Sequence, residues 1–145
     1  MSAEIQENSN LTYRLYDYDR VDKNGSKRQL HVDKAMAVTN FKSSAEPRQP
    51  LRVLKYRQGV ASELLCRCKY FEVERVLVNT ERCREMVSVS ADENSFVILL
   101  CLNGCGSASF EGEAFNIFKG DCVFLPANSA EVKLHGKMQF LKVFC

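Results

Sequence analysis

The sequence predicts an all-β protein, a sandwich or small barrel, with one short helix near its N-terminus. From about Leu51 onward, short segments rich in valine, isoleucine, leucine and phenylalanine follow one another closely. Turn signals centred on glycine or proline separate them, a pattern typical of antiparallel all-β domains rather than of alternating strands and helices. These signals are Asn103-Gly104, Glu111-Gly112, Gly120-Asp121, Pro126-Ala127-Asn128 and His135-Gly136.

The N-terminal part of the chain is organised differently. Residues 4–20 predict two short strands joined by a polar turn, and the second of them carries charge on both faces, unlike an ordinary half-buried strand. Asn24-Gly25 is a strong turn signal. Good helix formers predict a short helix over Leu30–Val38, and the serines and prolines that follow predict a loop up to residue 50.

The later strands are each expected from a run of β-prone residues. The runs are LLCRCKYFEVERVLV, EMVSVS, SFVILLCL, GSASF, AFNIF, DCVFLPA, EVKLH and MQFLKVFC. Phe96, Ile98 and Leu100, with their neighbours, are expected in the core.

Composition narrows the class of function. A chain of 145 residues with 46% hydrophobic and 26% charged residues suits one globular domain. The net charge of +2 is spread through the sequence, which argues against nucleic-acid binding. No apolar run resembles a signal peptide or a membrane span, so we expect a soluble, cytoplasmic protein.

The seven cysteines include no C-x-x-C pair, and the two histidines are far apart. Cys66 and Cys68 would share a strand face and could contact a soft metal, but free thiols in a reducing cytoplasm are the favoured interpretation. His31 is expected to pack at the helix start, and His135 to lie on the surface.

The segment GDCVFLPA resembles the second sequence motif of the cupin superfamily. Gly120 is followed after five residues by Pro126, but Glu131 stands where metal-binding cupins have a histidine and Asn128 where glycine is usual. The expected strands before Gly120 contain no histidine either. Residues 51–145 therefore resemble a metal-free, C-terminal cupin domain, which implies a jelly-roll β-sandwich.

A second resemblance covers the N-terminal segment. The run EIQENSNLTYRLYDYDR, followed by GSKRQLHVDKAMAV, is similar to type I mannose-6-phosphate isomerases of the short bacterial form. Asn10 and Glu7 stand where this family has aspartate and glutamine. A degenerate cupin at the C-terminus also fits the family, so the resemblance spans essentially the whole chain.

The resemblance implies an aldose–ketose isomerase that interconverts mannose 6-phosphate and fructose 6-phosphate. The family holds zinc with a glutamine, a glutamate and two histidines that would precede Glu4, and this chain begins three residues before Glu4. We therefore expect no cofactor in this chain and no activity of the chain alone. Whether it serves as an enzyme at all stays open at this point.

Two catalytic residues are carried over from the family. Arg14 matches an arginine that lies over the substrate, where a fixed cation would stabilise negative charge on an enediolate oxygen. Glu4 matches a pocket carboxylate that could handle a proton or orient a sugar hydroxyl. The alternatives are that Arg14 pairs with Asp17 or Asp19, and that Glu4 is merely solvated. Arg20 is expected to be structural.

Residues 1–50 are thus interpreted as a remnant of the catalytic cupin half. The chain would be the C-terminal part of a mannose-6-phosphate isomerase or, alternatively, a non-catalytic cupin that binds a ligand or a protein. Expected partners are a sugar phosphate and either an N-terminal catalytic half or a second copy of the chain. Neither nucleic acid nor membrane is expected.

Overall fold

The computed structural model describes residues 3, 5–6, 8–39, 41 and 54–145. The chain divides into two compact units, Met1–Arg48 and Gln49–Cys145. Glu4 and most of the expected loop after residue 39 lie outside the described residues. The functional roles that the sequence assigns to the two segments stay predictions.

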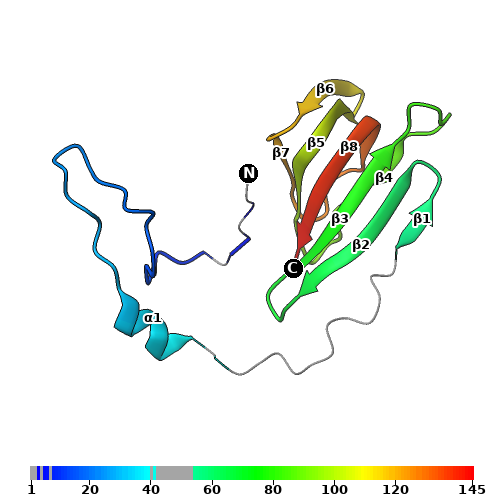
Figure 1. Cartoon of the computed structure of the whole chain (residues 1–145). Helices are drawn as coiled ribbons and strands as arrows, with labels where there is room; N and C mark the ends of the chain where they lie inside the picture. Colours follow the sequence, from blue (N-terminus) through cyan, green and yellow to red (C-terminus); the bar gives the residue numbers. More distant parts are fainter. Residues whose placement is uncertain (1–2, 4, 7, 40, 42–53) are drawn as a thin grey trace. The chain divides into compact units, whose positions relative to one another are not determined.

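The first unit consists of loops and one helix, α1 (Val32–Val38) (Figure 1). The expected helix is confirmed, although it begins two residues later than predicted. The Asn24-Gly25 turn is confirmed as well: Gly25 has a φ of +78° and donates its N–H to the Asp22 carbonyl at 3.0 Å. Left-handed backbone of this kind is what makes glycine favourable there.

The two expected strands within residues 4–20 are wrong for the residues that the structure describes there. Tyr18 and Asp19 both have positive φ, 53° and 54°, and two such residues in succession cannot continue a strand. The Arg20 N–H donates to the Asp17 carbonyl at 3.0 Å, which closes a turn. The charged residues Asp17, Asp19 and Arg20 therefore belong to a turn and not to a strand.

The second unit is an antiparallel β-sandwich, as the sequence predicts. Its strands are β1 (Lys55–Arg57), β2 (Val60–Arg67), β3 (Glu72–Asn79), β4 (Val87–Val89), β5 (Val97–Phe110), β6 (Glu113–Phe118), β7 (Cys122–Leu125) and β8 (Val132–Phe144). They form one hydrogen-bonded sheet in the order β1-β2-β3-β8-β5-β6, with β4 paired to β8 and β7 to β5.

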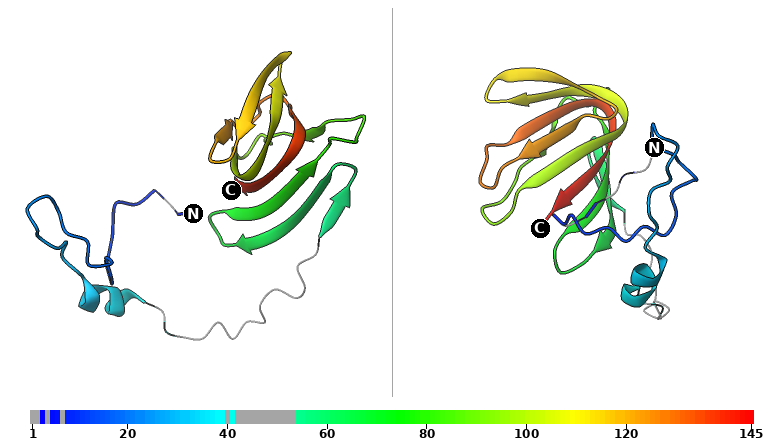
Figure 2. Two further views of the ribbon diagram at one scale, coloured as in Figure 1. Left: turned by 45° about the horizontal axis from the view of Figure 1, so that its top comes forward. Right: turned by 90° about the vertical axis from the view of Figure 1, so that its left-hand side faces the viewer.

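Two long strands, β5 and β8, carry this sheet from one layer into the other. The first part of β8 pairs with β4 and its later part with β3, while β5 pairs first with β7 and then with β6. Both strands curve strongly (Figure 2). The two layers enclose one core cluster, in which Leu99, Ile117, Leu134 and Phe140 are almost fully buried.

Two of the expected turns lie inside these long strands instead. Asn103-Gly104 is part of β5, and His135-Gly136 is part of β8. A Cβ at Gly104 would lie 2.0 Å from the Lys137 carbonyl oxygen, so the absence of a side chain allows β5 and β8 to approach closely. These glycines therefore permit the bend between the layers rather than a chain reversal. The expected turns at 111–112, 120–121 and 126–128 do separate strands.

Candidate functional site

Arg14 lies half-buried in the first unit, held by its own backbone. Its N–H donates to Nδ1 of His31 at 3.2 Å, and its carbonyl accepts from the His31 N–H at 2.7 Å. The His31 ring also meets the Tyr13 ring edge-on, with centroids 6.5 Å apart. His31 precedes α1 directly, which confirms its packing role and fixes Arg14 against the start of the helix.

Only some of the N–H donors of the Arg14 guanidinium form hydrogen bonds with described residues. One nitrogen, Nη1, donates to the Gln29 carbonyl at 3.0 Å. Within the described residues Arg14 makes no ion pair, so the alternative in which Asp17 or Asp19 neutralises it is not what the structure shows. The remaining guanidinium N–H groups have no described protein acceptor and could bind oxygen atoms of a ligand.

Asp17 is the buried anchor of the same unit, with 6% of its surface exposed. Arg28 donates to both of its oxygens, at 2.7 Å from Nε and 2.5 Å from Nη2, and Arg20 donates to Oδ1 at 2.5 Å. The Arg28 guanidinium, helped by Arg20, holds the pKa of the Asp17 carboxyl well below its usual range. The structural role expected of Arg20 is confirmed, whereas the role of Arg28 was not predicted.

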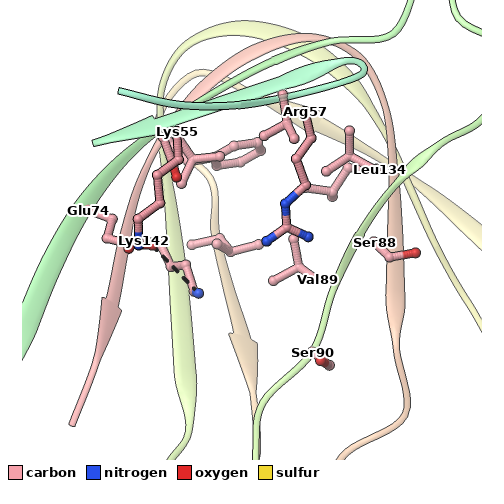
Figure 3. Close-up of a pocket in the computed structure, with 14 residues that line it drawn as sticks. Lys55, Arg57, Glu74, Ser88, Val89, Ser90, Leu134 and Lys142 are labelled. Carbon is pink, nitrogen blue, oxygen red and sulfur yellow. Dashed lines mark ion pairs between the residues drawn. The ribbon is translucent and has the colours of Figure 1, made fainter. Parts of the chain in front are cut away.

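A second candidate site is a cavity of about 330 Å³ in the β-sandwich unit. Strands β1 and β8 place three cations in its wall, Lys55, Arg57 and Lys142, and β3 adds one carboxylate, Glu74. Lys142 and Glu74 form an ion pair of 3.7 Å (Figure 3). The remaining lining comprises serines and apolar core residues: Ser62, Ser88, Ser90, Val60, Val76, Val87, Val89, Leu99, Leu134 and Phe140.

The described residues do not fit the zinc ion that the resemblance implies. No group of three or more histidine, cysteine, aspartate or glutamate side chains is close enough among them to hold a metal. His31 is bonded to the Arg14 backbone, and Nδ1 of His135 lies 3.0 Å from the Thr80 hydroxyl. His135 is exposed, as expected, and the thiol of Cys68 donates to the Phe71 carbonyl.

Sequence reasoning found Arg14 but not the cavity. Lys55 and Arg57 are two residues apart on a three-residue strand, and strand alternation puts them on one face. That spacing is visible in the sequence. What the sequence does not show is that Lys142, on the last strand, lies beside them, because the pairing of β8 with β3 decides this.

Comparison with solved structures identifies the fold. A cupin 2 conserved barrel domain protein from Salinispora arenicola CNS-205 matches 70% of this chain with a TM-score of 0.51 at 19% identity, covering 89% of that chain. A likeness at this identity concerns the fold alone. The second unit is therefore a cupin-type β-sandwich.

The family assignment is more specific. The family described as mannose-6-phosphate isomerase, cupin domain, matches residues 62–145, and the chain belongs to this family. The protein YvyI of Bacillus subtilis (strain 168) is 34% identical over 140 residues, which are 92% of this chain and 40% of that protein.

One solved structure is similar to nearly the whole chain. The crystal structure of the mannose 6-phosphate isomerase from Bacillus subtilis has a TM-score of 0.72 at 29% identity, covering 95% of this chain and 41% of that one. The chain thus spans about two-fifths of the length of these relatives.

The described residues form a single helix, α1, of seven residues, and this helix is not long and apolar enough to span a membrane.

Proposed function

We propose that this chain is the C-terminal part of a mannose-6-phosphate isomerase and contributes Arg14 to an active site for aldose–ketose isomerisation. The observation that carries the proposal is the placement of Arg14. Its backbone is fixed by two hydrogen bonds to His31, and its guanidinium keeps N–H donors that no described residue accepts. Family membership and the segment EIQENSNLTYRLYDYDR support the same assignment.

The chemistry assigned to Arg14 is electrostatic. Isomerisation removes a proton from the carbon next to a carbonyl group, and negative charge then develops on oxygen. A guanidinium remains charged at any working pH and, when already held in place, stabilises that charge with little reorganisation. The contact from Nη1 to the Gln29 carbonyl restricts the side chain and so prepares it for this role. Glu4 is proposed as a second catalytic group, for proton transfer or for orienting a hydroxyl.

We further propose that the chain alone neither holds zinc nor isomerises mannose 6-phosphate. The absence of a metal-binding group among the described residues supports this. Residues that act together in catalysis lose far more than additively when part of the set is missing. A complete active site would then need the portion of the enzyme that the relatives possess and this chain does not match.

Exposed apolar side chains of the first unit support a partner of that kind. Leu11, Leu15, Tyr16 and Tyr18 are between 53% and 77% exposed, and in α1 Met36 is 50% exposed. Apolar surface of this extent marks an interaction site in a small unit. We propose that the catalytic half of an isomerase covers it; self-association of the chain is the competing outcome.

A chimaeric enzyme tests the proposal. The part of the Bacillus subtilis mannose 6-phosphate isomerase that this chain does not match is joined to this chain, and the fusion is assayed with mannose 6-phosphate beside the isolated chain. The proposal requires an active, zinc-containing fusion and an inactive isolated chain. Turnover by the isolated chain, or a folded fusion with bound zinc and no turnover, would contradict it.

A non-catalytic cupin that binds a small ligand is the second candidate. The cationic cavity of the second unit favours it, because that cavity does not involve Arg14. We place the chain in the cytoplasm under either proposal, and the absence of disulfides among its seven cysteines supports this.

A further inference from the structure

The cavity of the β-sandwich unit carries an excess of positive charge. Lys55, Arg57 and Lys142 contribute three positive charges, and Glu74 contributes the one carboxylate in the lining. Glu74 already pairs with Lys142 at 3.7 Å. Within the described part of the chain, Lys55 and Arg57 have no ion-pair partner. The lining therefore carries a formal charge of +2 (three cations minus one carboxylate) that no other described residue of the lining balances.

Two of these cations lie on the edge strand of the sheet. Strand β1 has only three residues, pairs with β2 alone, and places Lys55 and Arg57 on the same face. Two like charges at neighbouring positions on one face repel each other. In Figure 3 the Arg57 side chain projects into the middle of the cavity, and the Lys55 and Lys142 side chains lie on one side of it. An anion placed between them would relieve the repulsion.

We propose that this cavity binds a small phosphate monoester. A phosphate monoester carries a charge of about −1.5 to −2 at neutral pH, which matches the +2 of the lining. The guanidinium of Arg57 can donate two parallel N–H bonds to phosphate oxygens, and the lysines add point charges. This inference names a ligand for the second candidate function and does not depend on the isomerase proposal.

The rest of the lining sets the kind of ester. Hydroxyls of Ser62 and Ser90 offer donors and acceptors for the hydroxyl groups of a polyol. The buried side chains of Leu99, Leu134 and Phe140 form an apolar part of the wall. A volume of about 330 Å³ is near the lower limit for ligand pockets, so the ester must be small.

Isothermal titration of the full chain tests the site with four probes: inorganic phosphate, mannose 6-phosphate, mannose and succinate. Saturable binding of the two phosphates is expected, with weaker binding of succinate and none of mannose. Arg57→Gln should weaken phosphate binding about tenfold or more, the usual effect of removing a hydrogen bond to a charged group. Lys55→Gln should weaken it as well.

Arg82→Gln is the matched control, because Arg82 is exposed, lies in the same unit and does not line the cavity. It removes the same charge and should leave phosphate affinity within about twofold. Binding that Arg57→Gln and Arg82→Gln weaken equally would show general attraction to a basic surface and overturn the proposal. So would the absence of saturable phosphate binding, or tighter binding of succinate.

The alternative role for charges on an edge strand is to prevent pairing with another sheet. It predicts that Arg57→Gln aggregates and that the soluble wild-type protein does not bind phosphate. Circular dichroism and sizing of each variant accompany the titrations, and Lys55→Gln provides a second measurement if Arg57→Gln is insoluble. The chimaeric isomerase assay is independent, since it depends on Arg14 and not on this cavity.

Discussion

Gly104→Ala is expected to destabilise the cupin unit far more than Gly112→Ala, although both positions require left-handed backbone. The φ angles are +85° at Gly104 and +89° at Gly112. A Cβ at Gly104 would lie 2.0 Å from the Lys137 carbonyl oxygen, whereas a Cβ at Gly112 would meet no atom within 4 Å. The pair therefore separates backbone strain from steric overlap.

The expected magnitudes follow from these two terms. Left-handed backbone costs a residue with a Cβ about 1–2 kcal/mol at either position. At Gly104 the clashing atom belongs to the backbone of β8 and cannot move by changing rotamer, so overpacking adds about 1–3 kcal/mol. We expect Gly112→Ala to cost about 1–2 kcal/mol and Gly104→Ala about 2–5 kcal/mol of unfolding free energy.

Urea unfolding of the full chain, followed by circular dichroism, measures both losses. In thermal unfolding, each kcal/mol should lower the midpoint by about 4–8 °C for a unit of roughly 100 residues. Losses of unfolding free energy that are equal within about 0.5 kcal/mol, a typical experimental margin, would refute the close approach of β5 and β8 at Gly104.

Three further predictions concern the ionisable groups. Asp17→Asn should reduce the hydrogen-exchange protection of the Arg20 amide far more than Asp19→Asn, because Asp17 is buried between two arginines while Asp19 pairs with an exposed lysine. The pKa of Asp17 is depressed in the folded unit. The stability that its ionised carboxylate contributes is therefore present above the ordinary carboxyl pKa, about 4, and is lost as the pH falls toward the folded pKa. Protection of the Arg20 amide that does not fall with acidification would contradict this. Burial raises the pKa of the Cys101 thiol, so a thiol reagent should label the exposed Cys66, Cys105 and Cys122 rapidly and Cys101 only on unfolding; equal rates would exclude the buried position. Metal analysis of the purified chain should find no stoichiometric zinc, and one tightly held zinc lost in a Cys66→Ser/Cys68→Ser variant would show a thiolate site.

The sequence was sufficient for the fold class of the second unit because alternating apolar residues and turn signals are local. It failed where one glycine signal has two structural uses: Gly104 and Gly136 look like turn residues but serve the close approach of two long strands. Only the pairing of β5 with β8, which joins residues far apart in the chain, distinguishes these uses.

The prediction of strands in the first unit failed for a related reason. Alternation of charged and aromatic residues indicated a strand, but three side chains brought together from different positions, Asp17, Arg20 and Arg28, stabilise a turn instead. Arg14 could be selected from the sequence through family resemblance. Its attachment to His31 and Gln29 could not, because it depends on how the loop returns to the start of α1.

The turnover number of the chimaeric isomerase, with and without Arg14, tests the central claim most directly. Arg14→Ala should lower kcat about a hundredfold or more, the usual scale for losing one preorganised electrostatic group. Arg20→Ala removes the same charge from the same unit. Among the described residues the Arg20 side chain donates only to Asp17, so this variant should lower stability and leave kcat nearly unchanged at temperatures where the enzyme is folded. An Arg14→Ala enzyme as fast as its parent would contradict the assignment of Arg14 to the active site.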